Sequence, residues 1–163
     1  MEKIERRIVV NMDLCIGCRS CAAACAARYE GFSNLNFSSV RDVAVLPLHC
    51  RHCEQPACVL ACPWEAMVKD ADGLVKRFNQ LCTGCGSCIQ ACPFGVISPE
   101  LGRRISRKCD LCVDRTSRGE IPRCVASCTS GALTFSEVVE VESGARDIYI
   151  GGRIVSRSQV RRM

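Results

Sequence analysis

Apolar residues of this chain come in short runs, each bounded by polar residues, glycine or proline. Ile8–Val10 and Val43–Leu46 have the length and the β-branched or aliphatic composition of short strands. Residues 67–78 hold two such segments on either side of Asp72-Gly73, a pair typical of a β-hairpin turn. The pattern therefore predicts several small sheets.

Helices are expected only in short pieces. Residues 18–27 are rich in alanine, which favours a helix, and a second short helix is predicted over residues 87–91. Residues 31–39 and 116–122 are predicted to be polar loops. Short helices with small sheets give α+β as the predicted fold class.

The last 28 residues differ from the rest, because no cysteine occurs in them. Within residues 136–163, the segment 147–156 predicts a hairpin around Gly151-Gly152. Residues 157–163 are basic, and we expect them to be a solvated surface tail rather than a binding element.

Composition changes this picture, because 16 of the 163 residues are cysteine while only 5% are aromatic. A chain with so few large apolar side chains needs cross-links in place of part of its hydrophobic core. Residues 1–10 lack the apolar run of a signal peptide, and no apolar stretch is long enough to span a membrane. We therefore expect a cytoplasmic protein whose cysteines bind metal.

The cysteines fall into four groups of four, and none is left over. The third group has the spacing C-x2-C-x2-C-x3-C-P of bacterial-type [4Fe–4S] ferredoxins, in which the fourth cysteine ligates the other cluster of a pair. The first group lacks the proline, the second gains two residues, and the fourth contains a long loop. The groups are Cys15, Cys18, Cys21 and Cys25; Cys50, Cys53, Cys58 and Cys62; Cys82, Cys85, Cys88 and Cys92; and Cys109, Cys112, Cys124 and Cys128.

Glycine and proline recur beside these cysteines as parts of an internal repeat. The segments N-M-D-L-C-I-G-C and N-Q-L-C-T-G-C contain Gly17 and Gly84, which are expected to relieve crowding where the backbone passes closest to a cluster. Pro63 and Pro93 follow the last cysteine of two groups and fix the direction of the chain there. Three cysteines two residues apart also let backbone amides point at the cluster sulfurs.

Two alternatives for the cysteines stay open. The fourth group by itself also suits a Zn(Cys)4 site, and disulfides remain a minor alternative.

The net charge of +5 counts cysteine as neutral. Four clusters would each contribute about −2 and leave a net charge of about −3, so nucleic acid is not an expected partner.

Two further motifs carry a resemblance to a known family: C-R-H-C-E-Q-P-A-C at residues 50–58 and K-C-D-L-C-V-D-R at residues 108–115. Over about residues 8–135 the chain resembles the four-cluster, ferredoxin-like iron–sulfur subunits of the dimethyl sulfoxide reductase type. The family includes the small electron-transfer subunits of formate dehydrogenases, hydrogenases, carbon monoxide dehydrogenase and tungsten aldehyde oxidoreductases. Thr129 stands where the other groups suggest proline, a departure that leaves the ligand Cys128 in place.

The resemblance implies two nested ferredoxin-like modules that bind four [4Fe–4S] clusters. The inner module would cover residues 47–101, and the outer module residues 1–31 with 102–135. The implied ligands are Cys15, Cys18, Cys21 and Cys128 for cluster 1; Cys50, Cys53, Cys58 and Cys92 for cluster 2; Cys62, Cys82, Cys85 and Cys88 for cluster 3; and Cys25, Cys109, Cys112 and Cys124 for cluster 4. Spacing alone supports the exchange of ligands in the inner pair, and the outer exchange rests on the resemblance.

Several residues near the cysteines invite a more specific role. His49 and His52 flank Cys50, but sixteen cysteines already complete four sets, so hydrogen bonding or packing is expected of both. The only tryptophan, Trp64, is expected to shield a cluster from water. Glu54, Asp110 and Asp114 are expected to be solvated surface positions.

The sequence contains no Ser/His/Asp constellation, glycine-rich nucleotide loop or pair of catalytic carboxylates, so the protein itself is not expected to catalyse a reaction. The preferred hypothesis is a subunit that relays single electrons between a catalytic redox subunit and a second acceptor such as a flavoprotein subunit. Because the chain is short, a tungsten aldehyde-oxidoreductase-type partner is preferred. Carbon monoxide dehydrogenase (a nickel enzyme), a formate dehydrogenase–hydrogenase complex, self-association into a longer wire and a free polyferredoxin are the alternatives.

Overall fold

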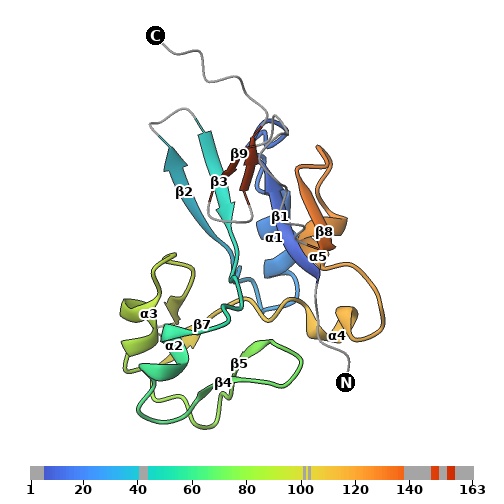
Figure 1. Ribbon diagram of the computed structural model, residues 1–163. Helices are drawn as coiled ribbons and strands as arrows, with labels where there is room; N and C mark the ends of the chain where they lie inside the picture. The colour runs from blue at the N-terminus through green and yellow to red at the C-terminus, as the bar shows by residue number, and fades with distance from the viewer. Residues whose placement is uncertain are drawn as a thin grey trace.

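The computed structural model describes residues 6–40, 44–100, 102, 104–137, 148–150 and 154–156. Its elements gather into two halves (Figure 1). One half holds the first helix and the strands from the two ends of the chain, and the other holds the segment from about residue 50 to residue 98. The first half contains segments from both ends of the chain, and the second half contains the middle segment. Cysteines that are distant in the sequence can therefore lie close together in the first half.

A four-stranded sheet with the order β8-β1-β10-β9 belongs to the first half. β1 (Arg6–Asn11) pairs antiparallel with β8 (Leu133–Glu137), so that Ile8 lies opposite Phe135. β10 (Ile154–Ser156) pairs parallel with β1 and antiparallel with β9 (Ile148–Ile150). The strands of the predicted C-terminal hairpin are confirmed, whereas the turn and the basic tail lie outside the described residues.

Two short helices pack together beneath this sheet: α1 (Ser20–Ala26) and α5 (Arg123–Ala126). The alternation of burial along β1 points Ile8 and Val10 into a core that also contains Leu35 and Leu133. Three cysteines, Cys21, Cys25 and Cys124, belong to the same core. The predicted helix over residues 18–27 is therefore confirmed, and its apolar face consists largely of cysteine and alanine.

The second half repeats this design on a smaller scale. α2 (Ala57–Leu60) packs against α3 (Ser87–Ala91), and β4 (Met67–Lys69) pairs antiparallel with β5 (Val75–Arg77). The predicted hairpin and the second predicted helix are confirmed; Gly73 takes a positive φ of 84° in the turn. The core of this half contains Met67, Val75, Val96 and Ile97 together with buried cysteines.

Two more hairpins and one helical turn lie between these units. β2 (Asn36–Val40) pairs with β3 (Ala44–Leu48), and β6 (Ser98–Glu100) pairs with β7 (Ile105–Arg107). α4 (Val113–Thr116) follows β7. The prediction of a loop over residues 31–39 is wrong at its end, because residues 36–39 pair with β3 and their polar side chains gave no strand pattern.

The small sheets and short helices confirm the predicted α+β class. None of the described helices is long and apolar enough to cross a membrane. The longest has seven residues, and helices of that length have little stability alone, so packing against neighbouring elements must stabilise them.

Candidate functional site

Cysteines from distant parts of the sequence line three cavities. One cavity lies at the N-terminal end of α1 and is lined by Cys15, Cys18, Cys21 and Cys128, with Phe37 and Val45 on its wall. Cys128 is more than a hundred residues from the other three in the sequence and reaches them because α5 packs against α1. These four are the residues expected to bind cluster 1.

A second cavity is lined by Cys25, Cys109, Cys112 and Cys124, the residues expected to bind cluster 4. Apolar side chains, including Ile8, Leu35 and Leu111, complete its wall. Burial raises the pKa of Cys124 to about 12, and the neighbouring Cys112 and Cys25 contribute to this rise. The cysteine sulfurs are therefore close enough for their charges to repel.

A third cavity lies in the other half of the molecule. Its lining includes Cys62, Cys82, Cys85 and Cys88, the residues expected to bind cluster 3, together with Trp64. Burial raises the pKa of Cys88, and the charges of Cys82, Cys62 and Cys85 add to this effect. Trp64 stands at the cavity but leaves 55% of its surface exposed, so it covers the site only in part.

Electrostatic interactions indicate that the remaining four cysteines also lie close together. Burial raises the pKa of Cys58 to about 11, and Cys50, Cys92 and Cys53 contribute to this rise while Lys108 opposes it. These are the residues expected to bind cluster 2. Cys58, whose pKa is raised by three neighbouring thiols, needs a cation close by to take up the charge of its thiolate, so the donor set suits an iron–sulfur core.

Interactions between sets indicate which ones are neighbours. Burial raises the pKa of Cys109 well above its usual range, and the charges of Cys50 and Cys124 raise it further. Cys21 likewise raises the pKa of Cys124. Cys109 and Cys124 belong to one expected set, Cys50 to another and Cys21 to a third, so the first of these sets lies next to each of the other two.

The four sets differ in their access to solvent. Cys18 and Cys85 are the two exposed cysteines, and they belong to the first and third cavities. All four cysteines of the second cavity are buried. The structure pairs none of the sixteen cysteines in a disulfide, so every thiol is available as a ligand.

Serine hydroxyls that follow a cysteine by two residues contact three of the sulfurs, a feature that we did not predict. Ser20 Oγ lies 3.4 Å from Cys18 Sγ, and Ser87 Oγ lies 3.5 Å from Cys85 Sγ. Ser130 Oγ lies 3.7 Å from Cys128 Sγ. Each serine follows its cysteine by two residues, so the recurring C-x-S pattern was a usable signal. The contact with serine lowers the pKa of both exposed cysteines, Cys18 and Cys85.

Backbone amides donate to buried sulfurs in the same local manner. His52 N lies 3.5 Å from Cys50 Sγ, and Leu111 N lies 3.4 Å from Cys109 Sγ. Asn34 N donates to Cys25 Sγ over 3.3 Å from outside the cysteine run. Such N–H···S bonds stabilise thiolates and adjust the potential of a cluster.

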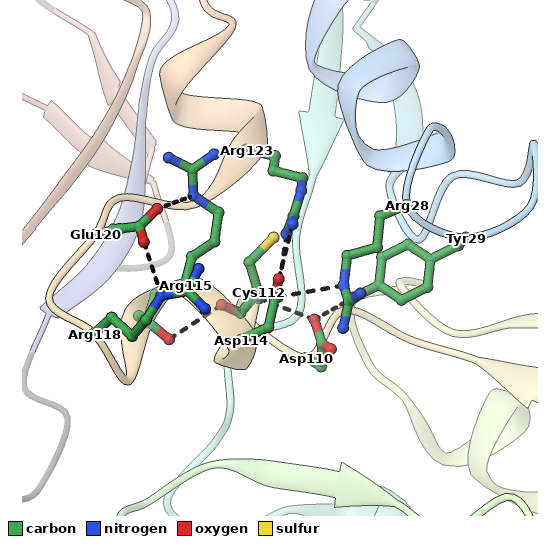
Figure 2. Close-up of polar contacts among 10 residues, drawn as sticks. Arg28, Tyr29, Asp110, Cys112, Asp114, Arg115, Arg118, Glu120 and Arg123 are labelled. Carbon is green, nitrogen blue, oxygen red and sulfur yellow. Dashed lines mark hydrogen bonds and ion pairs between the residues drawn. The ribbon is translucent and has the colours of Figure 1, made fainter.

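The carboxylates of Asp110 and Asp114 are fixed by partners rather than merely solvated, which corrects the expectation for both. Tyr29 Oη donates to Asp110 Oδ1 over 2.5 Å, and the amide of Cys112 donates to the same oxygen over 2.9 Å. Asp114 pairs with Arg123 through contacts of 2.8 and 3.1 Å (Figure 2). Sequence could not reveal these side-chain pairs, because Tyr29 lies 81 residues from Asp110 and Arg123 lies 9 residues from Asp114.

The charges of this network reach the cysteines of the second cavity. Arg28 Nε lies 3.2 Å from Asp114 Oδ1, so two arginines share one carboxylate (Figure 2). The hydrogen bond with Asp114 raises the pKa of Arg123, and a contact with Cys112 adds to it. Burial and Asp110 hold the pKa of Tyr29 well above its usual range, so Tyr29 stays a donor.

Other predicted positions have simpler roles. His52 Nδ1 accepts a 3.0 Å hydrogen bond from Val75 N, which confirms the hydrogen-bonding role expected of this histidine. His49 is buried, and Glu54 is exposed as expected. Gly84 has φ of 73°, and a Cβ there would come within 2.1 Å of the carbonyl oxygen of Arg104, so no larger residue fits.

Comparison with known proteins agrees with the donor chemistry. Residues 41–138 match the family described as 4Fe-4S dicluster domain, and residues 12–28 match a 4Fe-4S binding domain. The nitrate-inducible formate dehydrogenase iron-sulfur subunit of Escherichia coli is 33% identical over 168 residues, an alignment that covers 85% of this chain and 56% of the relative.

Two more relatives show the same similarity. A tetrathionate reductase subunit of Salmonella typhimurium is 31% identical over 148 residues, which cover 83% of this chain and 59% of the relative. The thiosulfate reductase electron transfer subunit of Salmonella typhi is 33% identical over 154 residues, which cover 83% and 79%. The chain thus spans less than two thirds of the formate dehydrogenase and tetrathionate reductase subunits. It belongs to the 4Fe-4S dicluster domain family, binds [4Fe–4S] clusters and has the sixteen cysteines that four of them require.

Proposed function

We propose that this protein is the electron-transfer subunit of an oxidoreductase complex and relays single electrons between a catalytic redox subunit and a second acceptor. A [4Fe–4S] cluster supplies one-electron exchange, and the protein contributes binding, orientation and electrostatics. The observation that carries the proposal is the convergence of distant cysteines around cavities, of which two have an exposed cysteine and one has buried cysteines only. The relatives' names include the iron–sulfur subunit of a formate dehydrogenase and the electron transfer subunit of a thiosulfate reductase.

The proposed ligand sets are the four given above, each with three cysteines from one group and one from another. Two nested modules account for these sets: an inner one over residues 47–101 and an outer one over residues 1–31 and 102–135. Residues 136–163 form the third proposed region, although β10 joins the sheet of the outer module. The packing of α1 on α5 and of α2 on α3 supports one helix pair per module.

The proposed order of the relay runs from cluster 3 to cluster 2, then to cluster 4 and cluster 1. Repulsion between Cys109 and Cys50 supports the contact between the two modules, and repulsion between Cys124 and Cys21 supports the last step. The inner pair is supported by the run Cys88-x3-Cys92, because these two cysteines belong to different sets. Four successive sites in line suit a wire better than a storage site.

Exposed apolar side chains that are close in sequence to ligands of clusters 1 and 3 support partner docking at these two sites. Leu14 and Ile16, which are 48% and 72% exposed, flank Cys15 near Cys18. Leu60, Trp64 and Leu81, which are 51–85% exposed, lie beside ligands of cluster 3. Exposed apolar patches of this kind mark interaction sites and would exclude water where an electron enters or leaves.

For the catalytic partner, a tungsten aldehyde-oxidoreductase-type enzyme is the first proposal, and a second proposal follows from the relatives. A formate dehydrogenase or a reductase is favoured by the names of the similar subunits. Affinity purification of the native complex, followed by metal analysis for tungsten, molybdenum and nickel, separates these partners. A monomer without such a metal would favour the free polyferredoxin instead.

Cell fractionation tests the proposed cytoplasmic location.

The nested ligand sets are tested by replacing Cys128 with serine. We expect loss of cluster 1 alone, because Cys15, Cys18 and Cys21 lose their fourth ligand. Ser130→Ala is the matched control, since it removes the nearby hydroxyl and keeps all sixteen thiols. Loss of the cluster assigned to Cys25, Cys109, Cys112 and Cys124 instead, counted by electron paramagnetic resonance, would refute the outer exchange.

A further inference from the structure

Lys108 is a lysine in an unusual position, because only 7% of its surface is exposed. Lysine is almost never buried to this extent unless its charge is compensated. Its Nζ donates to the carbonyl oxygen of Val75 over 2.5 Å and to that of Cys109 over 2.9 Å. Both acceptors are neutral backbone carbonyls, so they do not supply the negative charge that would balance the ammonium of Lys108.

The nearby negative charges are those of ligand sulfurs. Val75, whose carbonyl oxygen accepts from Lys108 Nζ, packs in one buried cluster with Cys50 and Cys109, and Cys58 packs against that cluster. Cys58 and Cys109 belong to different ligand sets, those of clusters 2 and 4. Lys108 is therefore a single cation that acts on two sets at once.

A series of hydrogen bonds joins the same two sets through the backbone of β5. His52 N donates to Cys50 Sγ over 3.5 Å, and Val75 N donates to His52 Nδ1 over 3.0 Å. The carbonyl of Val75 then accepts from Lys108, whose second acceptor is the carbonyl of Cys109. Val75 is only 1% exposed, so the whole path from Cys50 to Cys109 runs through the interior.

We propose that Lys108 is a positioning residue of the electron relay: it holds Cys109 against the inner module, and its buried positive charge raises the reduction potentials of clusters 2 and 4 together. The inference rests on the proposed ligand sets. Reduction adds one negative charge to a cluster, so a fixed cation nearby stabilises the reduced form, and it does so most strongly where water is excluded. The two central sites thereby stay matched to each other.

Lys108→Met tests the proposal, because methionine keeps an unbranched side chain and removes the charge. Potentiometric titration followed by electron paramagnetic resonance gives the potential of each cluster. We expect the equilibrium constant for reduction to fall about tenfold at two clusters, which is a shift of about 59 mV, while the other two keep their potentials. Lys69→Met is the matched control, since Lys69 Nζ also donates to a carbonyl, that of Glu54, but at an exposed position.

Two further variants separate charge from hydrogen bonding. Lys108→Arg keeps the charge, and we expect potentials near those of the wild type. Lys108→Gln keeps a donor without the charge, and we expect it to shift the same two clusters as methionine does. Equal potentials for the arginine and glutamine variants would overturn the proposal, as would failure of all three variants to assemble four clusters, because Lys108 would then serve assembly alone.

The wild-type protein distinguishes failure of this inference from failure of the proposed function. Four clusters in the wild type with unchanged potentials in Lys108→Met would refute only the role of Lys108. A wild type without four clusters would refute the ligand sets themselves. A uniform shift of all four potentials in Lys108→Met would also contradict the inference, because it would indicate a general change of the fold.

Discussion

The second and third cavities contain the same chemistry in opposite surroundings. Cys25, Cys109, Cys112 and Cys124 are all buried, and Ile8, Leu35 and Leu111 wall them in. The set Cys62, Cys82, Cys85 and Cys88 has one buried and one exposed member, beside the exposed Trp64. Four cysteines are present at both sites. The residues around them determine whether the cluster site is exposed to a partner protein or buried beside other clusters.

The two sites are also assembled differently. The exposed set comes from residues 62–88, within one compact stretch of the sequence. The buried set needs residues 25 and 109–124, which are brought together by β1–β8 pairing, by helix packing and by the network of Tyr29, Asp110 and Asp114 (Figure 2). Long-range assembly costs more conformational entropy, so the buried site depends more on its neighbours.

The largest effect is expected from removing one ligand at each site. Cys124→Ser and Cys85→Ser should each lose about a quarter of the bound iron. Cys124→Ser should also leave a hydroxyl in the apolar core around Ile8 and Leu133, and its apparent melting temperature should fall about 5 °C further than that of Cys85→Ser. Both are measured anaerobically at one scan rate, because unfolding with cluster loss is irreversible.

An equal fall in melting temperature for these two variants would contradict the comparison. It would mean that the cluster, and not the buried surroundings, determines the contribution of each site to stability. Ala22→Ser serves as a control at a partly buried position of the outer core that is not a ligand.

A smaller effect is expected from Tyr29→Phe. The change removes the hydroxyl that donates to Asp110 and joins the segment after α1 to the loop that carries Cys109 and Cys112. Loss of one hydrogen bond to a charged group, which contributes about 1.5–3 kcal/mol, should lower the apparent melting temperature measured anaerobically at the same scan rate. A double-mutant cycle with Asp110→Asn measures the coupling, and additive effects of the two changes would rule the bond out as a stabilising contact.

Asp114→Asn should destabilise the folded protein by about 1 kcal/mol, because two arginines then lose the partly buried carboxylate that they share. Arg123 lowers the pKa of Asp114, so this stabilisation is fully present above the carboxyl's unfolded value of about 4 and is lost only as pH falls through the lower folded value. The difference from wild type should thus stay constant from about pH 6 to pH 8. A marked change over that range would mean that another group titrates, and Glu120→Gln, an exposed pair with Arg118, is the control.

The smallest effect is expected from Ser87→Ala, which removes the hydroxyl at 3.5 Å from Cys85 Sγ. Loss of a hydrogen bond to a ligand sulfur should lower the potential of cluster 3 by less than about 59 mV. Ser98→Ala removes a hydroxyl that contacts Asn36 instead and serves as the control. A shift at a cluster other than cluster 3, in a redox titration, would contradict the assignment of Ser87 to this site.

Local signals predicted much of this fold. Apolar runs and the Asp72-Gly73 turn predicted β1, β3 and the β4–β5 hairpin, the alanine-rich segment 18–27 predicted α1, and a short helix was also expected where α3 lies. The strand β2 was missed, since Asn36 and Ser38 do not form an apolar alternation with their neighbours. α2, α4 and α5 have four residues each, too few for helical periodicity to appear.

The candidate site was predictable where ligands are spaced regularly and not where distant segments meet. The spacing of the sixteen cysteines predicted that they are ligands. The contacts of Ser20 and Ser87 with cysteine sulfurs could have been predicted from the repeated C-x-S pattern. The buried Lys108 could not be distinguished from a surface lysine, because its acceptors belong to Val75 and to its own neighbour. Such roles depend on tertiary packing, which local sequence does not encode.

Iron and sulfide analysis combined with Mössbauer spectroscopy of anaerobically purified protein tests the central claim most directly. Four clusters predict about sixteen iron atoms and as many sulfides per chain, all in [4Fe–4S] environments. Protein that is colourless, contains zinc in place of iron or holds fewer than four clusters after full reconstitution would contradict the account.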